Sequence, residues 1–371
     1  MTNKLGLYFH FPFCEKKCFY CDFYSLTKKE LSSEYINALL RHIEEKKDEA
    51  HGRTVDTIYI GGGTPSLMSG DEAKLLFEKI FECFEVSSDC EITLEVNPKT
   101  ADLSKLKAFR EAGVNRLSIG MQSANDEELE KLGRIHNFSD VEKTVCDAKQ
   151  AGFNNIGVDL IYGLPNQSIA SWESTLNKAV ALDVDHISFY AITIEEGTPF
   201  YKMELELPTD EEQEKMYFAA LDVLSSNGFV QYEISNASKN GKESRHNKKY
   251  WNLEEYLGFG ASAHSFFNGK RFFVIGDLKK YIKTHSFEKL IIEETQRPHD
   301  RIFEYIMLSL RTSEGISYEK LSQYCDLNYI EEMKEKLPSM YDNGYIEYTE
   351  QGFRLTSRGY FISNLIITQL M

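Results

Sequence analysis

The chain has no apolar run long enough to cross a membrane as a helix. Its N-terminus, Met-Thr-Asn-Lys-Leu-Gly-Leu-Tyr, lacks the apolar stretch and small-residue cleavage site of a secretion signal, so we expect a cytoplasmic protein. Positive charge is also scarce, with 42 Lys and Arg against 58 Asp and Glu and a net charge of −16. A field of that sign repels phosphate backbones, so nucleic acid is not an expected partner.

The number of cysteines is odd, whereas a framework of disulfides would need an even number. The chain has seven cysteines, and Cys14, Cys18 and Cys21 lie within eight residues. An odd, clustered set in a cytosolic chain argues for metal binding rather than disulfides. Free cysteine is among the most often buried residue types, so we expect the scattered four to be small core residues. They are Cys83, Cys90, Cys146 and Cys325.

Strand and helix patterns alternate over the first two-thirds of the chain. Short apolar runs, several of them β-branched or aromatic, are typical of buried parallel strands. The six candidates are Leu5–His10, Thr57–Ile60, Glu91–Glu95, Arg116–Met121, Asn155–Leu160 and His186–Ala191. Capping boxes predict the starts of three intervening helices. They are Ser69 with Glu72, Ser139 with Glu142, and Thr209 with Glu212.

Residues that could bind a ligand or take part in catalysis lie at the C-terminal ends of many of these strands. The cysteine loop follows the first strand, and other such residues follow the later ones. These are Gly61–Pro65, Glu95, Gln122, Asp159 and Ala191. In a barrel, functional residues come from the C-terminal ends of several strands, which meet on one face. In an open sheet they lie mainly at the point where the strand order reverses. We therefore predict an α/β fold with a partial (β/α)6 TIM-like barrel over residues 1–235.

The pattern changes after about Asn236. Ser235–Arg245 is polar and predicts a loop, and we expect residues 236–297 to form a connecting segment that packs on the barrel. Residues 298–371 read as three helices and a hairpin near Tyr345–Leu355, which is the order of a winged helix. Residues 300–371 hold seven Lys and Arg against eleven Asp and Glu, so we interpret this unit as a packing or partner module rather than a DNA reader.

The clustered cysteines have the spacing Cys-x3-Cys-x2-Cys. Thiolates are the soft ligands that iron–sulfur clusters take. Three ligands on one loop leave the fourth iron of a cubane open to chelate a small molecule through an amine and a carboxylate. Two alternatives stay open on spacing alone. One is a zinc site with His10 as the fourth ligand, and the other is a set of inert cysteines.

The triad after the first strand, followed by Gly-Gly-Gly-Thr-Pro after the second, resembles the radical S-adenosylmethionine superfamily. Within it, the chain is similar to the oxygen-independent coproporphyrinogen III oxidases and, more closely, to the heme chaperones of the HemW type. The resemblance extends over essentially the whole chain. It implies a [4Fe–4S] cluster on Cys14, Cys18 and Cys21, with S-adenosylmethionine on the open iron.

The resemblance also implies roles for individual residues. Gly62, Gly63 and Thr64 would contact the methionine amino group, and Glu95 would hold the methionine or ribose end. The remaining implied contacts of S-adenosylmethionine are Tyr8, Tyr20, Gln122, Arg134, Asp159, Ala191 and His264. Taken singly, each of these residues has an ordinary structural alternative as a turn, core or surface residue.

Two features separate the branches of this resemblance. Coproporphyrinogen oxidases carry another cysteine two residues after the third, where this chain has Phe23, and they carry an N-terminal extension, whereas here the first strand begins by about Leu5. The run His246-Asn247-x-x-Tyr250-Trp251 matches that of the heme-chaperone branch. An imidazole is a good axial ligand of heme iron, so His246 is the candidate heme ligand. The alternative is a histidine hydrogen-bonded at a loop near the barrel mouth.

The leading hypothesis is a heme chaperone that passes heme to acceptor hemoproteins. The resemblance implies respiratory membrane proteins among the acceptors and allows a homodimer. The second reading is an enzyme of the oxidase type, in which a 5′-deoxyadenosyl radical drives oxidative decarboxylation, a reaction that both departures above argue against. The third is a zinc-stabilised binding module.

Overall fold

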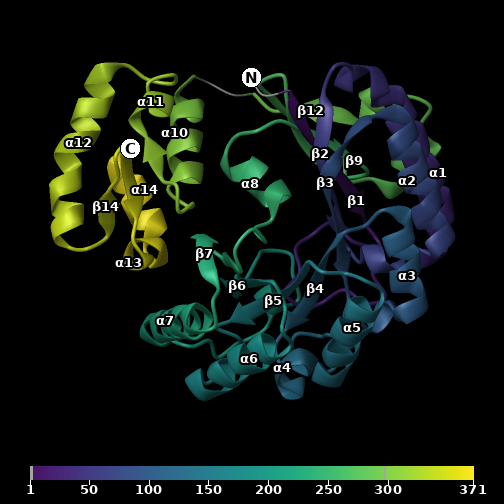
Figure 1. Cartoon of the computed structure of the whole chain (residues 1–371), viewed down its shortest axis with the longest axis horizontal. Helices are drawn as coiled ribbons and strands as arrows, with labels where there is room; N and C mark the ends of the chain where they lie inside the picture. The colour runs from purple at the N-terminus through teal and green to yellow at the C-terminus, as the bar shows by residue number, and fades with distance from the viewer. Residues whose placement is uncertain (1–2, 296–297) are drawn as a thin grey trace.

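A computed structural model describes residues 3–295 and 298–371 (Figure 1). Its main sheet has twelve strands in the order β12-β11-β10-β9-β1-β2-β3-β4-β5-β6-β8-β7. The first six strands pair in chain order and are all parallel, which confirms the predicted α/β partial barrel. They are β1 (Lys4–Phe11), β2 (Thr54–Gly62), β3 (Glu85–Val96), β4 (Arg116–Gln122), β5 (Ile156–Tyr162) and β6 (His186–Ala191).

Helices cover the outer face of these strands (Figure 1). They are α1 (Ser32–Lys46), α2 (Gly70–Cys83), α3 (Leu103–Ala112), α4 (Asp126–Lys131), α5 (Phe138–Gln150), α6 (Ile169–Ala181) and α7 (Asp210–Ser226). Short 3-10 turns lie at Lys29–Leu31, Lys47–Ala50, Pro65–Leu67, Pro98–Thr100, Phe200–Lys202 and Phe287–Leu290. In β1 the residues Leu5, Leu7, Phe9 and Phe11 are at most 1% exposed, so alternate side chains of the strand form the core.

Two of the three predicted capping boxes are confirmed, namely Ser69 with Glu72 and Thr209 with Glu212. The third is wrong, because α5 is capped two residues earlier, by Asn137 with Asp140. An Asn side chain accepts the orphan backbone N–H groups as well as Ser does, and here it takes the cap position first.

The segment after residue 235 adds strands at both ends of the main sheet. At one end, β8 (Asn236–Ser238) pairs antiparallel with β6 and with β7 (Val230–Glu233), so the predicted loop over Ser235–Arg245 is wrong there. At the other end, β9 pairs parallel with β1. This segment contains α8 (Arg245–Trp251), β9 (Tyr256–Phe259), β10 (His264–Phe267), β11 (Lys270–Val274), α9 (Leu278–Lys283) and β12 (Ile291–Glu293).

The C-terminal unit has the predicted order of three helices followed by a hairpin. Its elements are α10 (Pro298–Ser309), β13 (Ile316–Ser317), α11 (Tyr318–Leu321), α12 (Leu327–Asp342), β14 (Ile346–Tyr348), β15 (Gly352–Leu355), α13 (Ser357–Phe361) and α14 (Ser363–Leu370). Backbone hydrogen bonds from Ile234 N to Arg311 O (2.8 Å) and from Ser313 N to Tyr232 O (3.0 Å) join it to the barrel. The division of the chain at residue 235 stays a prediction, and the expected boundary near residue 297 lies outside the described residues.

The four scattered cysteines differ in burial. Cys90 is buried and Cys83 and Cys325 are partly buried, but Cys146 is exposed on α5, so its assignment to the core is wrong. Its helix turns one face to the sheet, and Cys146 is on the other face. Among the helices of the described residues, none has both the length and the apolar character that spanning a membrane requires.

The capping box of α2 yields a stability test. Replacing Ser69 by Ala removes the acceptor of the Glu72 backbone N–H, so we expect the free energy of unfolding to fall by about 1 kcal/mol in urea titration. The control is S225A, whose exposed hydroxyl donates only to the carbonyl of Asp222, and which should change stability by less than about 0.5 kcal/mol. Equal losses in the two variants would contradict the capping role.

Candidate functional site

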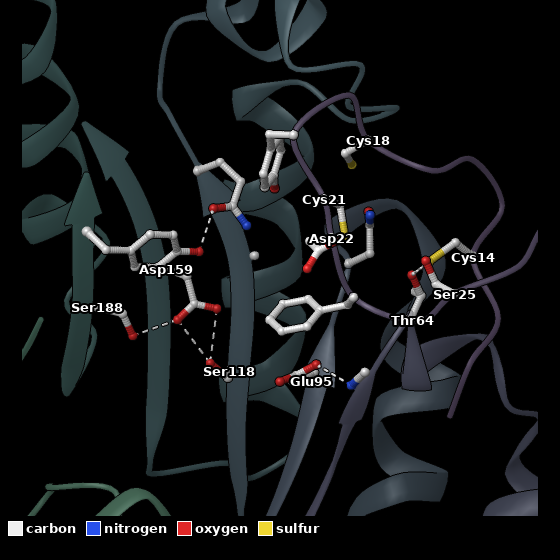
Figure 2. A pocket seen from close by; sticks show the side chains of 18 of the residues that line it. Cys14, Cys18, Cys21, Asp22, Ser25, Thr64, Glu95, Ser118, Asp159 and Ser188 are labelled. Carbon is white, nitrogen blue, oxygen red and sulfur yellow. Dashed lines mark hydrogen bonds between the residues drawn. The ribbon is translucent and has the colours of Figure 1, made fainter. Parts of the chain in front are cut away.

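A cavity of about 610 Å³ opens beside the cysteine loop and extends into the barrel (Figure 2). It brings together most of the residues that the sequence singled out. The three cysteines line it, as do nine of the eleven implied contacts of S-adenosylmethionine. The nine are Tyr20, Gly62, Gly63, Thr64, Glu95, Gln122, Arg134, Asp159 and Ala191.

Backbone hydrogen bonds hold the cysteine loop at the rim of this cavity. The Cys14 N–H donates to Leu26 O (2.9 Å), and the Leu26 N–H donates to Pro12 O (2.7 Å). Further along the loop, the Phe19 N–H donates to Leu132 O (3.0 Å). The loop is therefore tied at both ends, which fixes where its thiols lie.

The glycine turn after β2 lies directly against this loop. The Gly63 N–H donates to Phe11 O and the Thr64 N–H to Phe13 O, both at 2.8 Å. A Cβ atom on Gly62 would come within 2.5 Å of the His10 ring, and one on Gly63 within 2.7 Å of Phe13 O. Gly62 also has φ +109°, a conformation that favours glycine. Glycine is thus required at both positions, at Gly62 by the His10 ring and at Gly63 by the Phe13 carbonyl.

Polar neighbours face the three thiols. Thr64 Oγ1 donates to Cys14 Sγ (3.4 Å), and Arg134 Nη1 donates to Cys18 Sγ (3.6 Å). Burial raises the pKa of the Cys14 thiol and raises that of Cys21 to about 11. These thiols would bind as thiolates only if a metal centre replaced their protons, which is the usual behaviour of cysteine ligands.

The thiols are spread around the cavity mouth rather than gathered at one point (Figure 2). In the described part of the chain, no three His, Cys, Asp or Glu side chains converge as ligands of one ion. A zinc ion needs its ligands about 2.0–2.3 Å from a single centre, whereas an iron–sulfur cubane places each thiolate on a different iron. Three thiols at the rim of one cavity are a donor set that an iron–sulfur cluster can take.

Glu95 lies at the end of β3, where it accepts hydrogen bonds from Tyr59 Oη (2.9 Å) and from the Gly62 N–H (3.1 Å). Burial raises the pKa of its carboxyl to about 7, and the nearby charge of Asp159 adds to the shift, although both hydrogen bonds oppose it. Glu95 therefore changes charge near neutral pH, and a cationic ligand in the cavity would favour its ionised form.

Asp159 lies across the cavity from the cysteines (Figure 2). It accepts hydrogen bonds from Ser188 Oγ (2.7 Å) and Ser118 Oγ (3.1 Å), and burial raises the pKa of its carboxyl. Gln122 has φ +68° and accepts a hydrogen bond from Tyr190 Oη (3.4 Å), so it turns toward the mouth as its strand ends. The cavity thus carries acceptors on its walls and thiols at its rim.

Two of the eleven implied contacts are not among the lining residues. Tyr8 is hydrogen-bonded to His10 Nδ1 (3.0 Å) beneath the loop. The side chain of His264 is 59% exposed, lies 3.7 Å from Glu294 and stacks on Phe273. Their assignment to S-adenosylmethionine stays a prediction.

His246 lies at the opposite end of the barrel, on α8. It is fully buried, and its two ring nitrogens are hydrogen-bonded to Thr57 Oγ1 and to Tyr250 Oη, both at 2.8 Å. The Glu91 carboxylate accepts the N–H groups of Arg245 and His246 and so fixes the start of the helix. Burial lowers the pKa of His246 to about 3, so the ring is neutral. Heme ligation through this ring requires one of its hydrogen bonds to break.

Sequence reasoning missed the inner wall of the cavity, which is formed by Arg116, Ser118, His186 and Ser188. A signal was present, because side chains of a strand alternate between its two faces. Counting back by two from Gln122 gives Ser118 and Arg116, and counting back from Tyr190 gives Ser188 and His186. These polar residues occupy positions that an ordinary barrel fills with branched apolar side chains.

Comparison with known families assigns both parts of the chain. Residues 8–179 match the Radical SAM superfamily, and residues 296–362 match the HemN C-terminal domain.

Known proteins resemble the chain along nearly its whole length. A Bacillus subtilis protein named heme chaperone HemW is 36% identical and covers 96% of both chains, and the Escherichia coli protein of that name is 33% identical over 98% of this chain and 97% of its own. The solved structure of E. coli coproporphyrinogen III oxidase (HemN), titled a radical SAM enzyme, superposes with a TM-score of 0.85 at 23% identity. It covers 100% of this chain and 90% of its own, and this likeness establishes the fold.

The raised pKa of Glu95 leads to a pH prediction. Since the folded protein holds this proton up to about pH 7 and the unfolded chain releases it near 4.5, stability should fall as pH rises between these values. The loss amounts to at most about 3 kcal/mol. In E95Q this part of the pH dependence should disappear, as measured by urea titration at pH 5, 6, 7 and 8.

The matched control is E130Q, at an exposed glutamate of α4, which should keep the wild-type dependence. If E95Q and wild type had parallel stability curves, the carboxyl would not carry the raised pKa.

Proposed function

Because the chain belongs to the radical S-adenosylmethionine superfamily and, within it, to the family of the proteins named heme chaperone HemW, we propose that it binds heme and transfers it to acceptor hemoproteins. The observation that carries the proposal is similarity to proteins of that name over nearly the full length of both chains. Its proposed location is the cytoplasm. Respiratory membrane hemoproteins as acceptors and a homodimer are further parts of the proposal.

The cavity supports the second element of the proposal, a [4Fe–4S] cluster held by Cys14, Cys18 and Cys21. Three thiols at the rim of one cavity provide three ligands and leave one iron for another molecule. S-Adenosylmethionine is the proposed ligand of that iron, and it carries positive charge that Glu95 and Asp159 would face. The Gly62–Thr64 backbone would hold its methionine end.

His246 is the proposed heme ligand. Its neutral ring is in the protonation state that iron ligation needs. The helix that carries it is closed in this structure, because Tyr250 covers Nε2 and Lys249 forms a buried ion pair with Asp56 (2.8 Å). Heme loading would therefore require α8 to open, and Arg245–Trp251 would be the moving part.

A second candidate function is a radical S-adenosylmethionine enzyme of the oxidase type. The nine cofactor contacts that line the cavity favour it, since they form a site able to hold the cofactor. Phe23, exposed in place of a further cysteine, argues against coproporphyrinogen decarboxylation. An anaerobic assay with coproporphyrinogen III separates the two candidates, because formation of protoporphyrinogen IX would favour the enzyme.

The cluster proposal is tested by iron and sulfide analysis after anaerobic reconstitution. We expect about four irons per chain in the wild type and the loss of most of this iron in C14S, C18S and C21S, because each thiolate holds one corner of the cubane. C146S, at an exposed cysteine outside the cavity, should load normally. One zinc per chain and no sulfide would refute the proposal.

The heme proposal is tested by titrating the full-length protein with heme and following the Soret band. H246A should bind heme roughly ten-fold more weakly or worse, because it lacks the proposed axial ligand. H285A removes an exposed histidine to which no role is assigned and should bind as the wild type does. Wild-type affinity in H246A, or no Soret shift in the wild type, would count against the assignment.

A further inference from the structure

The inner end of the cavity is lined by residues that are not among the implied S-adenosylmethionine contacts. Along β4, Arg116, Ser118, Gly120 and Gln122 all line it, so one strand runs from its mouth to its floor. Gln122 and Arg116 are six residues apart, which corresponds to roughly 20 Å at the rise of a strand. Arg116 is the first residue of β4 and therefore lies at the barrel end that is remote from the cysteine loop.

Arg116 is a buried cation without an ion pair. It is 2% exposed, its Nε has no hydrogen-bond partner, and Nη1 makes only a long contact of 3.5 Å to Thr93 Oγ1. Within the described residues, no carboxylate oxygen lies within 4.0 Å of its guanidinium nitrogens. A buried charge is normally paired, since leaving it unpaired is costly. The vacant donors of Arg116 thus call for an anionic partner inside the cavity.

His186, the first residue of β6, provides a second vacant donor at the same end. It is 1% exposed, and its Nδ1 has no partner. Its Nε2 lies 2.8 Å from Tyr232 Oη, an oxygen that already accepts the Ser244 N–H (3.2 Å). The hydroxyl proton of Tyr232 is then free to be donated to Nε2. With that donation, the neutral ring carries its proton on Nδ1, as an N–H donor.

The neighbouring groups leave room for a ligand, and the Glu91 carboxylate at this end is already bonded to the N–H groups of Arg245 and His246. Gly157 lies between these strands, and a Cβ atom there would come within 3.3 Å of His186 Nδ1. Asn247, from α8, also lines the cavity at this closed end. The carboxyls of Asp159 and Glu95 are the acidic groups further up the wall, and burial raises the pKa of both. The charge of Arg116 also acts on Asp159, which accepts hydrogen bonds from Ser118 and Ser188, so an anion at the floor would meet donors below and a hydrogen-bonded carboxyl above.

We propose that Arg116 and His186 form a carboxylate-binding site at the floor of the barrel, separate from the cysteine loop. Its ligand is a molecule whose carboxylate reaches the floor of the cavity, where the guanidinium and the Nδ1–H donate to it. Two sources share this chemistry, a propionate side chain of a porphyrin and a free carboxylate metabolite. The porphyrin source rests on the proposed function, and the metabolite source does not.

The test uses full-length, anaerobically reconstituted protein and three probes: heme, heme with both propionates converted to methyl esters, and succinate. The variants are R116M and R116Q, which remove the charge while filling most of the space. The matched control is R110M, whose exposed side chain lies on α3 and donates to Val114 O. Iron content and melting temperature verify folding, and the charge-removing variants should melt no lower than wild type, because no ion pair is broken.

If the ligand is a porphyrin propionate, wild type and R110M bind heme about 10- to 100-fold more tightly than the diester, the range expected for charged hydrogen bonds, and R116M and R116Q lose that preference. If the ligand is a free carboxylate, succinate raises the melting temperature of wild type and R110M but not of the Arg116 variants. If neither difference is found, the proposal is overturned. Heme binding with no preference for the free acid, together with no effect of succinate, would overturn it while leaving the proposed function intact.

Discussion

The backbone contact between the end of β1 and the glycine turn after β2 holds the candidate site together. Parallel pairing brings Phe11 level with Gly62, and the turn then donates two N–H groups to the cysteine loop. Because the ring of His10 lies 2.5 Å from where a Cβ of Gly62 would be, this approach exists only with glycine. The same turn donates one N–H to Glu95, so the loop, the turn and the carboxylate of β3 are fixed as one unit.

The two faces of the barrel strands have separate tasks. The helix-facing side chains of β1, such as Leu7 and Phe9, are fully buried and contribute hydrophobic stability. The inward positions of β4, β5 and β6 instead carry Ser118, Asp159 and Ser188, which hydrogen-bond with one another and leave a cavity. A barrel interior is usually filled by branched apolar side chains. Here the lining is polar and the interior is not filled, so the barrel has space for a ligand but fewer apolar packing contacts.

The two ends of the barrel are linked by Tyr59. Its hydroxyl donates to Glu95 at the cysteine end, and its ring lies 5.4 Å from that of His246 at the other end. His246 in turn bonds Thr57 on the same strand, β2. A change in the charge of Glu95 would therefore be felt by the tyrosine that packs against the proposed heme ligand. These contacts connect the cavity mouth with α8 through one series of neighbouring side chains.

The sequence alone determined the local features, because those depend on neighbouring residues. The alternation of six strands with helices, the caps at Ser69 and Thr209 and the cysteine spacing were all readable from patterns of a few residues. The residues at the carboxyl ends of strands were found in the same way, since parallel strands bring those ends to one edge. Nine of the eleven implied cofactor contacts therefore line one cavity.

Only the tertiary structure decided what depends on partners distant in the chain. Short strands such as β8 and β9 cannot be recognised before their pairing with β6 and β1 is known. The burial of His246 and its two hydrogen bonds arise because Thr57 lies 189 residues away in sequence and next to it in space. From the sequence alone, Arg116 is indistinguishable from an ordinary surface charge, but in the folded barrel it is buried. Burial and partnership are properties of the folded chain, so a residue's identity could not reveal them.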